Sequence, residues 1–160
     1  MNKSILALVF SIFLAAPIFA ADLGGRVISI GSDTTYPPHE FIEDGVVKGF
    51  DVDVVAAICE RINCVPNWVT TAWDGIFPAL ANGEFDMVVS GVTITEERDK
   101  IVDFSDPYII VQQGILMRVS DKGATIDDFK SGAMKLASQN GTTNAALGEE
   151  LVGRDNLALF

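Results

Sequence analysis

Histidine, cysteine and positive charge are all scarce in this sequence. The single histidine, His39, stands beside Pro37 and Pro38, and we expect neither catalysis nor metal binding from it. The two cysteines, Cys59 and Cys64, are not spaced as C-x-x-C, which gives redox chemistry little support. Only 11 residues are Lys or Arg, against 22 that are Asp or Glu, so the net charge argues against nucleic acid and anionic membranes as partners.

A hydrophobic run long enough to span a membrane is also lacking. The apolar stretch from Ile5 to Ala16 is too short for a span, follows the charged Lys3 and leads directly into a cleavable I-F-A-A stretch. We therefore predict that residues 1–20 are a secretory signal, cut after Ala20. Removing it would take one lysine and no acid, leaving 10 basic residues against 22 acidic ones.

Export would place the two cysteines in an oxidising compartment. Cys59 lies near the end of a predicted helix and Cys64 just beyond it, so the intervening turn could bring the two together. A disulfide would close a very short loop and clamp the helix exit, with an entropic effect below roughly 3 kcal/mol. Two buried free thiols are the alternative.

Alternating strand and helix patterns predict an α/β fold with a parallel sheet. The strands are expected at 27–32, 66–70 and 87–89, with a helix at 51–62 and a second one that Asp74 caps and Gly83 ends. Right-handed crossovers would then place the strands side by side, with a ligand crevice outside their carboxyl ends.

Two local patterns refine this fold. In the first helix we expect Asp51 to act as the N-cap, while Val54, Ile58 and Ile62 recur at i+4 and form the buried stripe. Before that helix, Asp44-Gly45 between two β-rich runs predicts a hairpin.

The stretch from Phe85 to Tyr108 organises the chain. A short buried strand leads into a turn at Ser90-Gly91, and then into a helix that carries Arg98 in its first turn. Glycine lets a ligand approach the backbone closely, Thr93 offers a hydroxyl, and the guanidinium fits a carboxylate bidentately. These groups suit a small molecule bearing a carboxylate. The alternative is a plain strand–turn–helix in which Arg98 is solvated or salt-bridged.

Two other strand ends carry polar and aromatic residues. Prolines hold Asp33 and Tyr36 on a rigid loop after the first strand, and Trp73 follows the second. The two rings are candidate walls for an amphipathic ligand, and ordinary partly buried core aromatics are the alternative.

After Tyr108 the chain enters a second set of elements. An extended stretch at 109–119 is followed by a short helix at 126–129, a strand at 135–138, a helix through Leu147, and a strand in which the sequence stops. The turn at 139–143 could form a nest of N–H groups for an anion, or Thr142 or Thr143 could simply cap the helix. The pattern suggests a chain truncated at its C-terminus.

Four ordered motifs resemble those of family 3 bacterial extracellular solute-binding proteins, the periplasmic polar amino-acid receptors of ABC importers. They are Gly49–Ile58, Trp73–Leu80, Ser90–Arg98 and Asp103–Tyr108. The resemblance implies a periplasmic-binding-protein type II fold, with lobe 1 over 21–110 largely present. Residues 111–160 would form the hinge strand and a partial lobe 2.

The resemblance also implies roles for individual residues. Arg98 would hold the ligand α-carboxylate, and Asp33 would contact the ligand at a position that is acidic in several members binding cationic or amide amino acids. Gln139 stands where some glutamine-binding members have a basic residue. The expected ligand-binding residues are Asp33, Tyr36, Trp73, Ser90, Gly91, Thr93, Arg98, Thr142 and Thr143.

By the same resemblance the protein would be a periplasmic, monomeric, non-enzymatic component of an ABC transporter. It would capture a free polar amino acid and deliver it to the permease in the inner membrane, without a cofactor or a metal. Two alternatives are an enzyme of the same fold, similar to cyclohexadienyl or arogenate dehydratases, and an amino-acid sensor module that reports to a membrane kinase.

Overall fold

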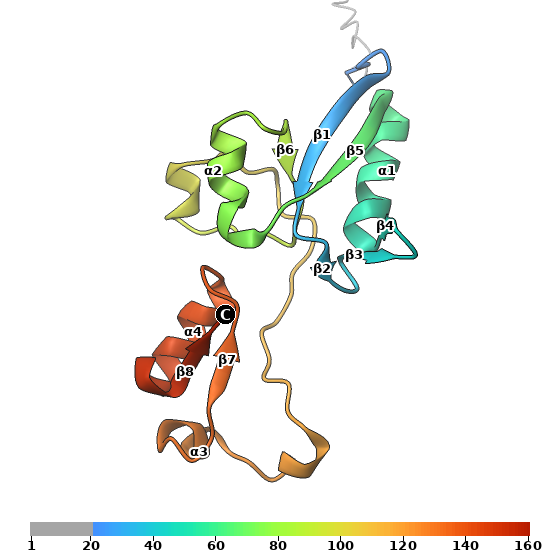
Figure 1. Ribbon diagram of the computed structural model, residues 1–160. Coiled ribbons are helices and arrows are strands. Elements are labelled where there is room, and N and C mark those ends of the chain that lie inside the picture. Colours follow the sequence, from blue (N-terminus) through green and yellow to red (C-terminus); the bar gives the residue numbers. More distant parts are fainter. Residues whose placement is uncertain (1–20) are drawn as a thin grey trace, which may run out of the picture.

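The computed structural model describes residues 21–160, so the predicted secretory signal lies outside the described residues. Figure 1 shows two groups of elements joined by one long segment. We call the elements from β1 to the turn at Arg98–Lys100 the first lobe, residues 103–118 the connecting segment, and the elements from Val119 onwards the second lobe. In the described part of the chain, no helix combines the length and the apolar character that crossing a membrane requires.

A parallel three-stranded sheet forms the centre of the first lobe, as predicted. Its order is β5-β1-β6, and the strands span Cys64–Thr70, Arg26–Ser32 and Met87–Val88. Ile30 of β1 is fully buried and packs with Val89, which follows β6. The next residue, Gly31, leaves room for the Phe85 ring, because a Cβ there would lie 2.5 Å from the ring carbon Cζ.

Helix α1 (Phe50–Ile62) forms as predicted, but the predicted cap and buried stripe are wrong. The buried residues are Asp51, Val55 and Cys59, whereas Ile58 is half exposed. Gly49 is the N-cap, because the Asp51 side chain turns inward to accept hydrogen bonds from other parts of the lobe. The face of α1 that is buried is therefore the one that carries Asp51.

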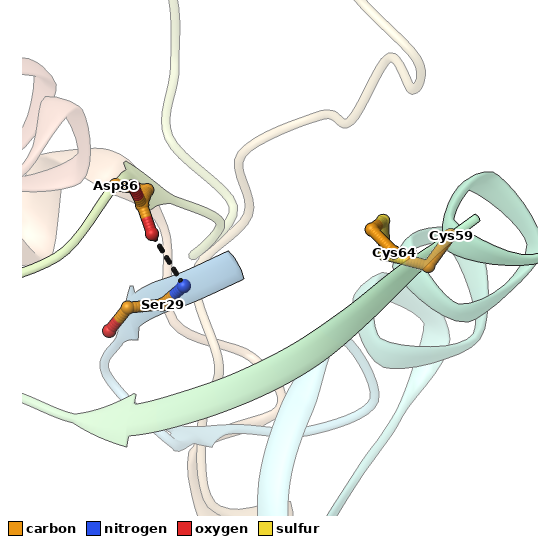
Figure 2. The surroundings of a disulfide bond; sticks show 4 residues. All are labelled: Ser29, Cys59, Cys64 and Asp86. Carbon is orange, nitrogen blue, oxygen red and sulfur yellow. Dashed lines mark hydrogen bonds between the residues drawn. A yellow bond between two sulfur atoms is a disulfide. The ribbon is translucent and has the colours of Figure 1, made fainter. Parts of the chain in front are cut away.

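The predicted disulfide is present. Cys59 of α1 is bonded to Cys64 at the start of β5, which ties the helix exit to the sheet (Figure 2). The same view shows Asp86, whose Oδ2 accepts a hydrogen bond of 2.8 Å from the Ser29 N–H of β1. Arg26 donates to its other oxygen, so Asp86 joins the approach to β6 to β1.

The predicted hairpin is also confirmed, as β3 (Glu40–Glu43) pairs antiparallel with β4 (Val46–Lys48). Asp44 and Gly45 between them both have positive φ, as a two-residue hairpin turn requires. Strand β2 (Thr35–Tyr36) pairs with β3, which places the loop after β1 beside Glu40.

The second crossover is shorter than predicted. A 3-10 turn at Trp73–Gly75 precedes α2 (Ile76–Ala81), which packs Ile76 and Ala79 against Phe85. Gly75 is the N-cap of α2, so the prediction of Asp74 as its cap is wrong. The 3-10 turn takes up the residues that would have formed the first helical turn.

The helix predicted to begin near Arg98, shortly after β6, is wrong, because no helix of several turns forms between β6 and the connecting segment. Arg98 instead begins a single 3-10 turn, Arg98–Lys100, and Thr95 Oγ1 accepts a hydrogen bond from its backbone N–H. Residues 96–100 are five consecutive charged residues, so this stretch has no apolar face to bury and gains little from a longer helix.

The second lobe has a small core of its own. Phe129, Val152 and Leu157 are buried together, and β7 and β8 pair in parallel with α4 packed on them. The short helix, strand and longer helix predicted here are confirmed. The elements are a 3-10 turn at Val119–Asp121, α3 (Ile126–Lys130), β7 (Leu136–Ser138), α4 (Thr143–Val152), a 3-10 turn at Arg154–Asn156 and β8 (Leu157–Leu159).

The connecting segment contains no helix or strand. Its side chains are largely exposed, with Ile110 at 94% and Leu116 at 100%. Two of its side chains nevertheless contact the lobes: the Tyr108 hydroxyl donates to Asp51 Oδ2 over 2.9 Å, and Gln113 Nε2 donates to Thr143 Oγ1 over 3.1 Å. The segment is therefore attached to the first lobe at Tyr108.

Candidate functional site

A cleft of about 1320 Å³ lies between the carboxyl ends of the sheet strands and the second lobe. Strand ends of a parallel sheet point backbone groups and loops in one direction, which is why a crevice forms there. Its lining includes all nine residues predicted as ligand-binding: Asp33, Tyr36, Trp73, Ser90, Gly91, Thr93, Arg98, Thr142 and Thr143.

Arg98 is partly buried within this cleft. Its guanidinium carbon lies 5.2 Å from the centroid of the Trp73 ring and 5.4 Å from that of Phe77. Nη1 donates to the Thr93 carbonyl over 2.9 Å and Nη2 to the Gly141 carbonyl over 3.2 Å. Desolvation lowers the pKa of Arg98 from its ordinary value, but a guanidinium keeps its charge at neutral pH. These contacts use two of its five N–H donors and leave three for a ligand.

Asp33 also connects the two lobes. Its Oδ2 accepts a hydrogen bond of 3.0 Å from Gln139 Nε2 at the end of β7, and its Oδ1 accepts one of 2.7 Å from the Thr35 hydroxyl. The carboxylate is therefore held in one orientation in the cleft.

Aromatic rings cover two parts of the cleft. Tyr36 lies over Gly91, where an added Cβ would be 3.0 Å from the ring, and stacks on His39 at a centroid distance of 5.1 Å. Trp73 meets Phe77 edge to face at 5.6 Å. Tyr36 is 48% exposed and is therefore no core aromatic, whereas Trp73 is partly buried and packs against the core of Ile76, Ala79 and Phe85, as the alternative expected. Trp73 also lines the cleft.

The turn after β6 already uses several of its polar groups within the protein. The Ser90 hydroxyl donates to Glu40 Oε1 over 2.9 Å and accepts from the Asp33 N–H. The Gly91 N–H, a predicted ligand contact, donates to Asp51 Oδ2 over 3.2 Å. In this structure the turn is therefore anchored from below by two acids.

Three threonines lie where the lobes meet. Thr142 caps α4, accepting from the Ala145 N–H over 3.0 Å, so helix capping accounts for its hydroxyl. Thr143 Oγ1 lies 3.3 Å from Thr93 Oγ1 and accepts from Gln113 Nε2 over 3.1 Å. The second lobe thus contacts the first through hydroxyl, amide and carbonyl groups.

Comparison with known proteins places this fold and cleft in a family. Residues 28–153 match the profile of bacterial extracellular solute-binding proteins, family 3. The chain belongs to this family. Among its relatives is a probable histidine-binding protein of Neisseria gonorrhoeae, 38% identical over 133 residues that cover 82% of this chain and 49% of the relative. Another is the L-arginine-binding protein of Pseudomonas aeruginosa, 37% identical over 119 residues, 74% of this chain and 44% of the relative.

Solved structures give the same fold for this family 3 protein. An ancestral amino acid-binding protein, described as a precursor of cyclohexadienyl dehydratase, superposes with a TM-score of 0.74 at 38% identity, covering 84% of this chain and 60% of that one. The arginine-, lysine-, histidine-binding protein ArtJ of Geobacillus stearothermophilus gives 0.67 at 29% identity, covering 84% and 58%. The chain spans about half the length of the curated relatives it matches.

Sequence reasoning missed a buried acidic cluster beneath the Ser90–Gly91 turn of this family 3 protein. Glu40 and Asp51 are fully buried, and His39 Nδ1 lies 3.6 Å from Asp51 Oδ1. One nitrogen or oxygen atom from each of these three side chains lies within 4.8 Å of the others. Burial raises the pKa of Glu40 to about 8, and burial together with the nearby Asp51 raises the pKa of Tyr108. The sequence signal for this cluster was limited to two acids, Glu40 at the start of the hairpin and Asp51 at the start of α1.

Proposed function

We propose that this protein binds a polar amino acid, preferably one with a cationic side chain, in the interlobe cleft and delivers it to an ABC permease. The observation that carries the proposal is the presence in one cleft of an oriented guanidinium, Arg98, and an oriented carboxylate, Asp33. A cationic amino acid carries groups that match both: an α-carboxylate for the arginine and a positive side chain for the aspartate.

The rings of Trp73 and Tyr36 support this choice. An aromatic face attracts a cation and also covers the apolar stem of a long side chain. Trp73 and Phe77 already hold the Arg98 guanidinium against their rings, which lowers the local polarity and strengthens its attraction for a carboxylate. The names of the histidine- and arginine-binding relatives agree with a cationic ligand.

Closure of the lobes would complete the site. Arg98 donates to the Gly141 carbonyl and Gln139 donates to Asp33, so the two lobes share contacts that a bound zwitterion would reinforce. Other periplasmic binding proteins close around their ligands by a hinge motion. Here the connecting segment would bend, and the closed form would present both lobes to the permease.

A thermal-shift screen of the purified protein against the twenty amino acids tests this proposal, since a ligand that binds only the folded state raises Tm. We expect arginine, lysine or histidine to give the largest shift, confirmed by calorimetry. Asp33→Asn should reduce the shift by cationic amino acids more than that by glutamine. The proposal fails if none of the twenty changes Tm or gives measurable heat.

We further propose that the protein is not an enzyme. The ancestral precursor of cyclohexadienyl dehydratase is itself described as an amino acid-binding protein, which agrees with a binding role on this fold. Incubation with prephenate and with arogenate should yield no product. Turnover of either compound that is lost in Arg98→Ala would instead establish the dehydratase alternative.

A further inference from the structure

Two fully buried acids, Glu40 at the start of β3 and Asp51 in the first turn of α1, lie beneath the Ser90–Gly91 turn of the cleft. One oxygen of each has partners: Glu40 Oε1 accepts from the Ser90 hydroxyl, and Asp51 Oδ2 accepts from the Gly91 N–H and from Tyr108. The remaining oxygens, Glu40 Oε2 and Asp51 Oδ1, are buried without a hydrogen-bond partner.

Two ionised carboxylates cannot share such a site at low cost. Each buried charge loses its hydration, the two repel one another, and each unpartnered oxygen adds a further penalty. A single shared proton neutralises one of the two buried charges, removes the repulsion, and gives both unpartnered oxygens a partner, since a protonated Glu40 Oε2 can donate to the Asp51 carboxylate. Burial is the first cause that raises the pKa of Glu40 to about 8, and both the charge of Asp51 and a hydrogen bond to it act in the same direction.

The hydrogen bonds also indicate which acid keeps the proton. Asp51 accepts from an N–H and from a phenol hydroxyl, and such donors favour a carboxylate acceptor. Glu40 accepts from one hydroxyl only. The titratable groups that face the pair come from three further places: Asp33 from the loop after β1, His39 from the loop before β3, and Tyr108 from the connecting segment.

We propose that Glu40 carries a proton shared with Asp51, and that this protonated pair positions the Ser90–Gly91 turn and the Tyr108 attachment for ligand binding. Glu40 is thus a positioning residue, and the part of the proposal that concerns binding rests on the proposed function. When the proton leaves to solvent, the two charges repel. Glu40 then separates from Asp51, and the turn held by both moves.

The first test needs no ligand. The Tm of the wild-type protein and of Glu40→Gln, which keeps shape and a hydrogen-bond donor, is measured from pH 5 to pH 9. Glu40 binds its proton more tightly folded than unfolded, so its stabilising contribution is complete below its ordinary value near 4.5 and is lost as pH rises through about 8. We expect the wild-type Tm to fall with rising pH relative to that of the variant. A constant difference across this range would overturn the proposal.

Glu43→Gln is the matched control. Glu43 lies on the same strand but is exposed and paired with Lys48, and this pairing lowers the pKa of Glu43. Its contribution is lost only in acid, so the control should follow the wild-type curve between pH 5 and pH 9.

Should Glu40→Gln fail to fold, NMR titration of the labelled glutamate carboxyls in the wild-type protein replaces it. A midpoint near 8 supports the proposal, and all midpoints below about 6 overturn it.

The second test uses arginine as the probe. The ratio of wild-type to Glu40→Gln Kd cancels the titration of the ligand itself, and we expect this ratio to rise about tenfold between pH 7 and pH 9, because only the protonated fraction binds. An unchanged ratio overturns the positioning role. If arginine does not bind at any pH, the amino acid with the largest thermal shift replaces it as the probe. If none of the twenty binds, the proposed function has failed together with this role, while the ligand-free curves still decide whether the proton is shared.

A divalent cation is the competing occupant of the same cluster, since a histidine and two carboxylates suit zinc or manganese. Zinc or manganese chloride should not raise the Tm of the wild-type protein by more than it raises the Tm of Glu40→Gln. A saturable rise that EDTA reverses and that Glu40→Gln lacks would overturn the shared proton in favour of a metal site.

Discussion

Replacement of Arg98 by alanine removes a guanidinium that contacts both lobes across the cleft. The side chain donates to the carbonyls of Thr93 and Gly141 and lies against two aromatic rings. If it also binds a ligand carboxylate in the closed cleft, alanine leaves that carboxylate desolvated and without a partner.

The expected loss follows from that arrangement. Truncating one partner of a buried, hydrogen-bonded charge pair costs about 2–5 kcal/mol of binding free energy. At about 1.4 kcal/mol per tenfold, Kd should rise by a factor of about 30 or more. Arg98→Lys keeps the charge but loses the planar fork, so we expect a smaller loss, nearer to that of one hydrogen bond, about 1 kcal/mol.

Isothermal titration calorimetry with the amino acid that gives the largest thermal shift measures these values. Arg61→Ala, an exposed arginine in the last turn of α1, is the control and should bind as the wild type does. Circular dichroism would establish that each variant is folded. Equal Kd values for Arg98→Ala and wild type would refute the assignment of Arg98 to the ligand carboxylate.

Three further predictions concern stability. Replacing both Cys59 and Cys64 by serine should lower the free energy of unfolding by about 2 kcal/mol, as a six-residue loop implies, and an unchanged urea midpoint would contradict this. Gly91→Ala should lower the free energy of unfolding more than Gly45→Ala. Both glycines have positive φ, which costs alanine roughly 1–2 kcal/mol, but only at Gly91 would the added Cβ meet an aromatic ring. Equal Tm values for the two variants would contradict this. A backbone N–H of β1 lowers the pKa of Asp86, so its stabilising effect is present above its ordinary value and is lost in acid. Below about pH 4 the wild-type Tm should therefore fall more steeply than that of Asp86→Asn, and parallel curves would exclude this role.

Periodicity and turn residues predicted the α/β fold well. The parallel sheet, the hairpin at Asp44-Gly45 and the disulfide are all present, because each depends on local chemistry that the sequence displays directly. The buried face of α1 was displaced by one position for a physical reason. Counting apolar residues cannot place an acid such as Asp51 on a buried face, since only its distant partners make that burial favourable.

The candidate site shows the same division. Motif resemblance predicted nine residues that line one cleft, since their spacing follows the ends of the strands. It could not show that the Gly91 N–H is already donated to Asp51, because that partner is set by tertiary packing. The cap that Thr142 forms on α4 is a local contact, and the sequence had offered it as an alternative. The helix predicted at Arg98 shortened to one turn because five consecutive charged residues leave it without an apolar face to bury.

The hydrogen bond from Tyr108 to Asp51 also determines where a swing of the second lobe can begin. This bond holds the preceding chain to α1, so we expect the pivot further along, where Ile110 and Leu116 are exposed and Gln113 contacts Thr143 of the second lobe. A small change in backbone torsion angles at that pivot would move the second lobe, including Gln139 and Gly141. Substitutions between 109 and 118 should therefore alter how far the two lobes separate, and leave the part of the cleft that the first lobe forms unchanged.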